Sequence, residues 1–476
     1  MAAMAVPCYD SGSLPIRVLS HRLVKASDPS IEPHVAAVFN LDLYPNIVQA
    51  SIVCLYPKPK LPTLAAGDFS AVVAVFEGFL PSLLNHFYPL AGRIVTNPTS
   101  GVPELHCHNQ GAELVVGEVG VALGSLDYSQ TEESLKKMML PYPEEVTLSV
   151  QLLSFSCGGF SVVWGNNNLV NDGHAITMMV RMWSELVRTG TIVTEDVPNH
   201  DRSVFRARDP PSYGVKVGDM FAAYDHDGLV NALTAHDSFV ERLYYIEAST
   251  IARLHELATS TGGQQLSSRV QALSAYLWKV LATVVATSRV REERCRMLWW
   301  VDGRRRITSP ELVPAMRSYF GNVTTYVVEE AAVEEIQRKP LAEVAAMVRE
   351  AITSIDYDEH IQELVDWVEE HKKQKIVEKA AVGLGSPTVN QTVFASFPLD
   401  MDFGFGQATL AMPVWHHGRL ASGNLAVGTR PGGDGSWIVN AYVWPRLAAA
   451  LESDGQCIFK PVTAEYLQFE ATIFTQ

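Results

Sequence analysis

Two patterns of apolar residues alternate along the chain, one typical of buried strands and one typical of amphipathic helices. Before residue 195 they predict strands at 17–20, 51–56, 146–155 and 160–165 and helices at 71–85 and 173–187. After residue 214 they predict strands at 239–246, 297–301, 322–328 and 437–442 and helices at 249–259, 268–286 and 341–355. Strands and helices mixed in this way predict an α/β fold.

A polar stretch rich in proline and aspartate, residues 195–214, separates the two halves. It interrupts both patterns, so we interpret it as part of a crossover linker. We predict an N-terminal domain over residues 1–200, a linker over 201–225 and a C-terminal domain over 226–476. With 476 residues, 47% of them hydrophobic, the chain can bury two cores. A crevice between two such domains is the expected place for a ligand.

The charge balance is acidic, with 37 Lys and Arg against 52 Asp and Glu and a formal net charge of −15. Such a field repels polyanions, which argues against a nucleic-acid partner and an anionic membrane surface. An anionic ligand then requires a local basic pocket. The sequence also contains no P-loop, G-x-G-x-x-G, G-x-S-x-G or H-E-x-x-H pattern, so the chemistries of those motifs have no sequence support.

Six scattered cysteines form no C-x-x-C pair and have no histidine at metal-ligand spacing. We therefore expect buried free thiols in a reducing compartment, with no zinc site and no disulfide framework. They are Cys8, Cys54, Cys107, Cys157, Cys295 and Cys457. Residues 1–12 have no basic start, and no stretch reaches the ~18 apolar residues of a membrane span, so we expect a cytoplasmic protein.

The segment 161–186 predicts a strand, a polar loop and a helix. One face of this helix is apolar and is expected in the core, and it carries Ile176, Met179, Val180, Trp183 and Leu186. Asp172 stands at the N-cap position just before the helix, and Gly173 follows it at the turn. Taken alone, this pair favours a structural Asp-Gly cap.

Three consecutive asparagines, Asn166, Asn167 and Asn168, occupy the loop before that helix. They bring many donors and acceptors that a buried loop must satisfy. One interpretation is ordinary turn chemistry. The other is that the loop faces a polar channel between the domains, with Asn168 four residues before Asp172.

This segment resembles the H-x-x-x-D-G region of the BAHD acyl-CoA-dependent acyltransferases, including a tryptophan, Trp183, eleven residues after the aspartate. Further runs resemble motifs of the same family. They are YPLAGR at 88–93, SRVQALSAYLW at 268–278, VDGRRR at 301–306, YFGN at 319–322 and DFGFG at 402–406. Together these fragments extend over nearly the whole chain, which makes chance a poor explanation.

The resemblance implies two chloramphenicol-acetyltransferase-like α/β domains with a solvent channel between them. Acyl-CoA, as co-substrate, enters from one face and an alcohol or amine acceptor from the other, with no metal or redox cofactor. In the family the histidine accepts the acceptor's proton, and the aspartate turns away from the channel to pair with an arginine. Asp172 keeps that structural role here, with Arg304 or Arg306 as its expected partner.

The expected catalytic histidine is replaced by Asn168, and an amide cannot take up a proton near neutral pH. Losing a general base costs ~10²- to 10⁴-fold in rate, whereas positioning of two substrates supplies on the order of 7–11 kcal/mol. Three hypotheses follow: a slow acyltransferase in which Asn168 donates to the carbonyl, an enzyme that uses another base, and a protein that only binds. His174 is the obvious replacement base, but its place at the helix start predicts a cap or solvent.

Other residues receive their expected roles mainly through the resemblance. Arg304, Arg305 and Arg306 form a local basic cluster that can contact CoA phosphates, and Ser268 caps its helix or bonds the pantetheine arm. Thr392 and Phe394 are expected in the acceptor pocket, which Phe394 and Phe405 make roomier and more apolar than tryptophans would. Asp402, Gly404 and Gly406 predict a tight structural turn.

We therefore predict an acyltransferase that moves an acyl group from acyl-CoA to an alcohol or amine in plant specialised, lipid or hormone metabolism. Asn168 and Asp172 mark its reaction centre, and a monomer is expected, although a homomer or a regulatory partner stays open. The alternative is a catalytically lapsed relative that acts as a ligand-binding or regulatory protein.

Overall fold

A computed structural model describes most of the chain. The described residues are 14–43, 49–59, 69–192, 197–223, 230–234, 239–259, 267–289, 292–374, 376–395, 397, 402–416, 420–453 and 455–469. Residues 1–12 with Cys8, the start of the polar stretch at Glu195, and residues 224–225 at the end of the predicted linker lie outside them.

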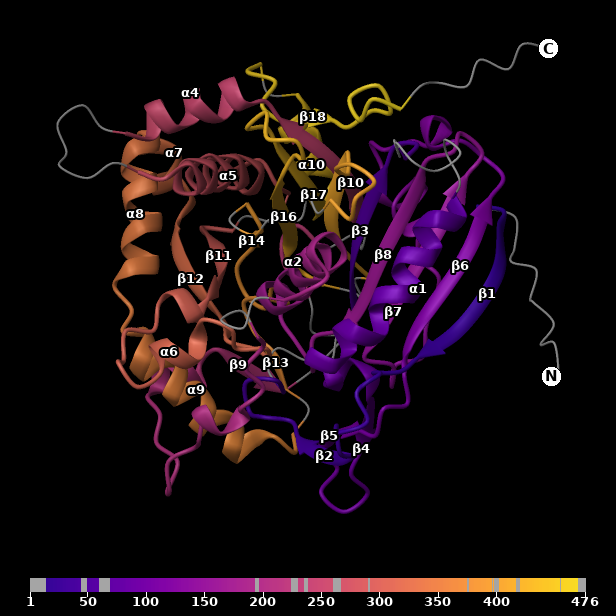
Figure 1. Ribbon diagram of the computed structural model, residues 1–476. Helices are drawn as coiled ribbons and strands as arrows, with labels where there is room; N and C mark the ends of the chain where they lie inside the picture. Colours follow the sequence, from indigo (N-terminus) through magenta and orange to yellow (C-terminus); the bar gives the residue numbers. More distant parts are fainter. Residues whose placement is uncertain are drawn as a thin grey trace, which may run out of the picture.

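The first domain is built on a six-stranded mixed sheet (Figure 1). Its strands, in spatial order, are β1 (Ile16–Val24), β6 (Ala112–Val119), β7 (Leu148–Phe155), β8 (Phe160–Asn167), β3 (Gln49–Tyr56) and β15 (Leu410–Trp415). Two helices, α1 (Phe69–His86) and α2 (Gly173–Thr189), contact each other, and their buried residues share one core cluster with residues of this sheet. A three-stranded sheet of β2 (His34–Ala37), β5 (Pro103–Cys107) and β4 (Arg93–Thr96) accompanies them.

The second domain is built on a seven-stranded sheet. Its order is β12 (Thr324–Ala332), β11 (Arg294–Asp302), β14 (Thr388–Val393), β16 (Gly423–Thr429), β17 (Trp437–Val443), β10 (Val240–Ile246) and β18 (Lys460–Pro461). Its longer helices are α4 (Ala248–Ala258), α5 (Arg269–Ala286), α8 (Leu341–Thr353), α9 (Tyr357–His371) and α10 (Pro445–Glu452). Shorter elements are α3 (Val215–Gly218), α6 (Val313–Met316), α7 (Val333–Arg338), and the ribbon of β9 (Phe221–Ala223) with β13 (Ile376–Glu378).

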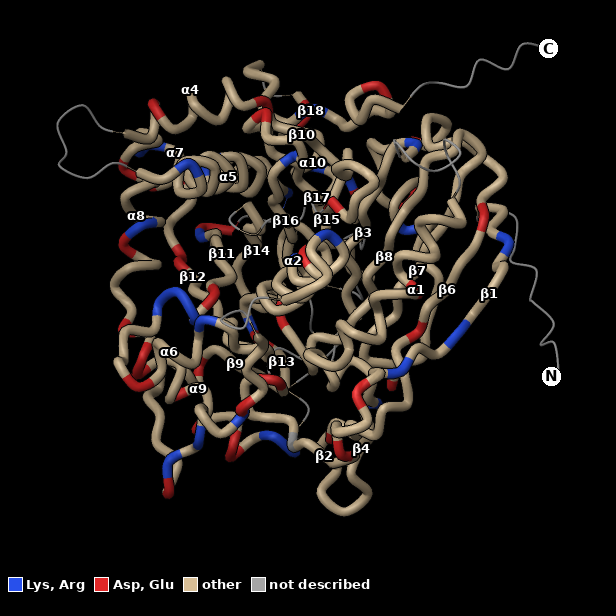
Figure 2. The backbone as a smooth tube through the Cα atoms, viewed as in Figure 1, with Lys and Arg blue, Asp and Glu red and all other residues tan. Residues whose placement is uncertain are grey.

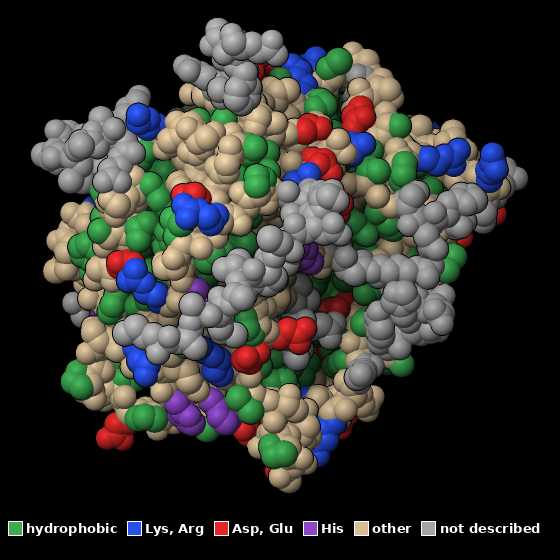
Figure 3. Space-filling view, turned by 90° about the vertical axis from the view of Figure 1, so that its right-hand side faces the viewer, with side chains coloured by type: hydrophobic (Ala, Val, Ile, Leu, Met, Phe, Trp, Pro, Cys, Tyr) green, Lys and Arg blue, Asp and Glu red, His purple; other side chains and the backbone are tan. Residues whose placement is uncertain are grey.

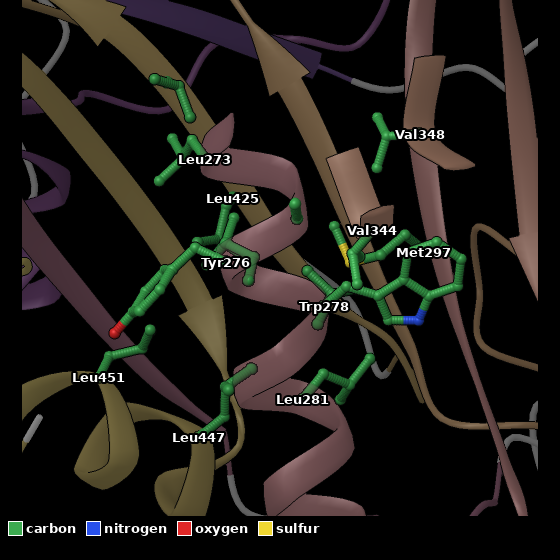
Figure 4. Packing of buried hydrophobic residues seen from close by; sticks show 14 of the residues in the cluster. Leu273, Tyr276, Trp278, Leu281, Met297, Val344, Val348, Leu425, Leu447 and Leu451 are labelled. Carbon is green, nitrogen blue, oxygen red and sulfur yellow. The ribbon is translucent and has the colours of Figure 1, made fainter. Parts of the chain in front are cut away.

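Helix α5 lies at the centre of the second core. Its buried residues include Leu273, Tyr276, Trp278 and Leu281, and they pack in one cluster with residues of α8, α10 and the sheet. Figure 4 shows these side chains among Val344 and Val348 of α8 and Leu447 and Leu451 of α10. This burial of large apolar side chains explains why the helical pattern of α5 is strong in the sequence.

Strand β15 crosses from the second half of the chain into the first sheet. It pairs antiparallel with β3, from Leu410 opposite Leu55 to Trp415 opposite Ala50, and Figure 2 labels it beside β3. A third apolar cluster joins the two sheets, with Val53 of β3, Met412 of β15 and Ile438 of β17. The two-domain α/β fold is therefore confirmed, but the predicted assignment of residues 226–476 to one domain needs this correction, because strand pairing joins residues distant in sequence.

The described part of the linker packs against the second domain, with Phe205, Val217 and Phe221 buried in one cluster with residues of α9. Between Arg202 and Ala223 it forms a 3-10 turn at Arg202–Val204, then α3 and β9. Arg208 pairs with the buried carboxylate of Asp366 on α9, which fixes the linker to that domain.

Charged residues of both signs are distributed along both domains rather than separated by sign (Figure 2). On the face shown in Figure 3, acidic and basic side chains are interspersed with hydrophobic ones. Leu19 and Leu23 of the edge strand β1 are among the exposed apolar residues of the molecule. The net charge of −15 therefore does not come from one acidic region, and a basic site has to be formed by a local group of arginines or lysines.

Among the described helices, one, α1, has the length and mean hydropathy of a membrane-crossing segment. Its buried residues lie in the core of the first domain, where Phe76 contacts Trp164 and Trp183 at ring-centroid distances of 5.7 and 4.9 Å. In this fold one face of α1 packs into the core of the first domain.

Candidate active site

A cavity of about 1040 Å³ lies between the two domains. The first domain lines it with the ends of β3 and β8 and the start of α2, and the second with β11, β14 and the start of α5. Its volume is at the upper end of the range for small-molecule sites. The ligand crevice predicted between the domains is therefore present.

The asparagine loop, residues 168–171 between β8 and the N-cap of α2, faces this cavity. Strand β8 ends at Asn167, whose Oδ1 accepts from the amide of Leu169 at 2.9 Å and turns the chain. The next residue, Asn168, is half-buried and lines the cavity, while its carbonyl oxygen accepts from Asn322 Nδ2 at 2.6 Å. Turn chemistry and a polar channel, the two interpretations from the sequence, are thus both present in one loop.

Asp172 forms the predicted interdomain ion pair. Its Oδ1 accepts from the amide of Ala175 at 3.0 Å and caps α2, and its Oδ2 accepts from Arg304 Nη1 at 2.7 Å. The same Oδ2 also accepts from the amide of Val323 and from Thr324 Oγ1, each at 3.0 Å. One carboxylate therefore joins the first turn of α2 to the second domain, and the prediction of Arg304 as its partner is confirmed.

Arg304 is buried and has little left to offer a ligand. Its Nη1 pairs with Asp172 and Asp302, its Nη2 donates to the carbonyl of Gly321 at 2.6 Å, and its Nε donates to that of Tyr319 at 3.2 Å. Burial alone would lower the pKa of the guanidinium, but the two carboxylates outweigh it and raise the pKa. The predicted contact of Arg304 with CoA is therefore corrected, because each of its nitrogens is occupied inside the protein.

A second buried network, absent from the sequence predictions, holds the asparagine loop from behind. Asp42 Oδ1 accepts from the amide and the Nδ2 of Asn322, both at 3.0 Å, and Asp42 Oδ2 pairs with Arg202 Nε at 3.2 Å. Asn322 is the last residue of the YFGN run at 319–322, so a sequence motif marks this residue. Nothing local in the sequence marks Asp42 or Arg202.

His174 lies beside the cavity and is paired. Its Nδ1 lies 2.8 Å from Asp302 Oδ2, its side chain is 25% exposed, and both residues line the cavity. The prediction of a cap or a solvent-facing ring was wrong, because the side of α2 away from its core face opens into the interdomain cavity. Burial would raise the pKa of the Asp302 carboxyl, but the bond to His174 and the charge of Arg304 lower it to about 2.

The other residues predicted to contact CoA, Ser268, Arg305 and Arg306, line the cavity but differ in how far their side chains are already bonded. Ser268 caps α5 in a capping box with Gln271, accepting from its amide at 3.1 Å, and also lines the cavity. Arg305 and Arg306 are exposed and line the cavity, and Arg306 lies 5.8 Å from the ring centroid of Tyr357. Arg269 is a third exposed arginine in the lining, and no motif in the sequence marked it.

Thr392 and Phe394 line the cavity where they were expected. Phe394 packs so closely on the start of α2 that a Cβ on Gly173 would lie 2.7 Å from its Cε1. Phe405 is instead buried in the first core, 6.0 Å from Phe160 between ring centroids. Its predicted effect on pocket size is therefore wrong, and only Phe394 bears on it.

The DFGFG run is a structural turn, as predicted. Asp402 Oδ1 accepts from the amides of Gly404 at 2.7 Å and Gly406 at 3.0 Å, and both glycines have positive φ, of 90° and 100°. The turn inserts Phe403 into the first core, where it stacks on Trp164 at 5.8 Å.

Within the described part of the chain there is no cluster of three or more potential metal ligands, and five cysteines are free. Cys54, Cys107 and Cys295 are buried, as expected, and burial raises the pKa of the Cys54 thiol to about 12. Cys157 and Cys457 are exposed, which corrects the expectation for these two.

Two mixed sheets, a strand that crosses between them, and a buried interdomain ion pair beside a large cavity define a two-domain acyltransferase fold. The fold matches TRI101 of F. graminearum complexed with coenzyme A and T-2 mycotoxin, with a TM-score of 0.72 and 17% identity over 90% of this chain and 99% of that one. The chain belongs to the family described as the Transferase family, the BAHD acyltransferases, whose model matches residues 14–453.

Two plant relatives support the same assignment. The chain is 26% identical to an omega-hydroxypalmitate O-feruloyl transferase of Arabidopsis thaliana, over 79% of each protein. It is 28% identical to a hydroxycinnamoyltransferase of Narcissus pseudonarcissus, over 79% of this chain and 85% of the relative. The family and these relatives indicate acyltransferase activity.

Proposed function

We propose that the protein transfers an acyl group from an acyl-CoA to an alcohol or amine acceptor inside the interdomain cavity. The observation that carries this proposal is Asn168, which lines a cavity built by both domains and is held there by Asn322. The nearby pair of Asp172 and Arg304 fixes the two domains around it.

Local positive charge supports acyl-CoA as the donor. Arg269, Arg305 and Arg306 are exposed and line the cavity of a protein with a net charge of −15. The guanidinium group binds phosphate oxygens through a planar fork of donors, and CoA carries several phosphates. These three side chains are therefore the proposed phosphate contacts, with Ser268 beside the pantetheine arm.

The lining favours a bulky, apolar acceptor. Phe394, Phe397, Trp415, Leu420 and Ile176 line the cavity together with Thr392. Apolar and aromatic surfaces of this kind bind by area removed from water and give few hydrogen bonds to a heavily hydroxylated acceptor. A long-chain or aromatic alcohol fits this lining, and the relatives named for hydroxypalmitate and hydroxycinnamoyl groups support that chemistry for the acceptor and the donor.

Asn168 supplies a donor to the reaction centre. When the acceptor atom attacks the thioester carbonyl, negative charge develops on the carbonyl oxygen, and the amide of Asn168 can donate a hydrogen bond to it. The same amide cannot take the acceptor's proton. Asn168 therefore stabilises the intermediate without acting as a base.

Release of free CoA from a panel of acyl-CoAs and acceptors tests the proposal. We expect turnover by the wild type and a loss of about 10²- to 10³-fold in kcat for Asn168→Ala, the usual effect of removing one donor to an oxyanion. Asn199→Ala is a suitable control, since Asn199 lies outside the cavity lining and bonds backbone groups. Equal turnover by wild type and Asn168→Ala contradicts the role of Asn168.

One observation favours a second function: the position of the expected base holds an amide. A relative that only binds acyl-CoA or a metabolite needs the cavity but no base. In that case the wild type is inert on every pair although CoA binds in calorimetry, and Asn168→His gains activity. That result assigns a ligand-binding or regulatory role on an intact acyltransferase scaffold.

A further inference from the structure

We propose that His174, oriented by Asp302, is the general base of the acyl transfer. This inference rests on the proposed function and adds the group that takes the acceptor's proton. It is carried by a contact within the cavity lining, His174 Nδ1 to Asp302 Oδ2 at 2.8 Å.

Asp302 determines which ring nitrogen is available. It is ionised, and its Oδ2 accepts the proton on Nδ1 of His174, so the lone pair of the neutral ring is on Nε2. Two groups hold the carboxylate itself: the amide of Arg304 donates to Oδ1 at 3.1 Å, and Arg304 Nη1 pairs with the same oxygen at 3.2 Å. The carboxylate is 12% exposed, so water competes little for it. A carboxylate, an imidazole and a free Nε2 are the parts of a base that is held in one tautomer.

The ring is also held from the side. Phe397 meets His174 edge-to-face, with ring centroids 5.2 Å apart and planes at 72°. The backbone of His174 is fixed by the first turn of α2, where its carbonyl accepts from Thr177 Oγ1 at 2.8 Å. With a side chain 25% exposed, the imidazole is neither buried out of reach nor free in solvent.

The charged groups around the ring come from three places. Asp302 ends β11, Asp172 caps α2, and the turn after β11 carries Arg304 together with Arg305 and Arg306, which line the cavity. Arg304 is balanced by the carboxylates of Asp172 and Asp302. The carboxylate nearest to the imidazole therefore stabilises the positive charge that His174 gains when it takes a proton.

In the proposed step His174 acts as the base, and Asn168 acts as a hydrogen-bond donor. Nε2 of His174 removes the proton from the acceptor O–H or N–H as that atom bonds to the thioester carbonyl carbon, while Asn168 donates to the carbonyl oxygen. When the intermediate collapses, the C–S bond breaks, and the imidazolium gives its proton to the leaving sulfur. The products are the ester or amide and CoA with a free thiol, so atoms and electrons balance with no further reactant.

The test compares His174→Gln and His174→Ala with the wild type in the CoA-release assay. We expect kcat to fall about 10²- to 10⁴-fold, the range for loss of a general base, with little change in KM for acyl-CoA. His106→Gln is the matched control, because His106 has the same 25% exposure and an acidic partner, Glu104 at 3.4 Å, but lies outside the cavity lining. Its kcat should stay within about twofold of the wild type.

Chemical rescue separates a base from a structural residue. Added imidazole should restore part of the activity of His174→Ala, and the double variant Asn168→His/His174→Gln should be faster than His174→Gln alone. Thermal melts confirm that the variants are folded. A folded His174→Ala that loses activity and responds to neither measure assigns a structural role and overturns the inference.

The same assay distinguishes failure of the inference about His174 from failure of the proposed function. If the wild type turns over and His174→Gln keeps its kcat within threefold, the base is not His174, and the acyltransferase proposal stands. If the wild type is inert with every donor and acceptor, the proposed function fails, and the inference about His174 fails with it.

Discussion

Replacing Asp172 by alanine is expected to cause a large loss of stability, because the carboxylate has two separable roles. It caps α2 through Oδ1, and it pairs with the buried Arg304 through Oδ2. The arginine side chain is 2% exposed and that of the aspartate 5%, so solvent cannot replace the lost partner. Asp172→Ala leaves a buried guanidinium with Asp302 as its remaining counter-charge.

The two roles give the magnitude. Loss of an aspartate N-cap costs about 1 kcal/mol. Removal of one partner from a buried ion pair costs about 3–5 kcal/mol, since the other charge stays buried. We therefore expect Asp172→Ala to lower the free energy of unfolding by about 4–6 kcal/mol. Asp172→Asn, which keeps an oxygen for the amide of Ala175, should recover only the capping part, about 1 kcal/mol.

Urea unfolding followed by tryptophan fluorescence measures the difference. Asp356 provides the matched control, because it caps α9 by accepting from the amides of Asp358 and Glu359 but is exposed. Asp356→Ala should cost about 1 kcal/mol, the capping effect alone. Equal losses for Asp172→Ala and Asp356→Ala, within about 1 kcal/mol, refute the argument that the buried pair joins the domains.

Three further predictions concern the rim of the cavity. Gly173→Ala should destabilise by about 1–3 kcal/mol in thermal melts, because its Cβ would lie 2.7 Å from Phe394, and Phe394→Leu should relieve part of that loss. Asp302 has a pKa lowered to about 2 from 3.8, so its stabilisation is present above about pH 4 and is lost as the pH falls toward 2. Acid titrations of unfolding should show on the order of 2 kcal/mol less acid dependence for Asp302→Asn than for the wild type. Arg306→Ala should raise KM for acyl-CoA about 3- to 10-fold if it contacts phosphate, and Arg317→Ala, the same charge change at an exposed site outside the cavity lining, should not.

Each helix and strand predicted from a local pattern overlaps an element of the structure, but others, such as β6 and α9, were not predicted. The helix predicted at 268–286 is α5, and the strand at 160–165 lies within β8, because periodicity reports which face of an element is buried. The caps at Asp172 and Ser268 were predictable for the same reason, since a cap involves only the next few residues. The confirmed predictions are therefore those that depend on residues close to one another in the sequence.

Contacts between distant residues could not be read from local patterns. Strand β15 joins β3 across more than 300 residues, and His174 meets Asp302 across 128. The pair of Asp172 and Arg304, 132 residues apart, was expected only because the motifs resemble those of the family. The role of His174 was mispredicted because a helix-start position away from the core looks solvent-facing until the second domain is placed beside it.

Asp302 connects the structural ion pair to the cavity, and this connection makes two variants informative together. Its Oδ1 accepts from Arg304, which Asp172 holds, and its Oδ2 bonds His174. Loss of Asp172 should therefore disturb both the domain contact and the orientation of the imidazole, lowering stability and kcat together. Loss of the imidazole in His174→Gln removes no buried charge, so it should lower kcat and leave the free energy of unfolding within about 1 kcal/mol. A variant pair that changes stability and rate in parallel would mean that the network serves only to hold the domains, whereas separation of the two effects assigns His174 to the chemistry.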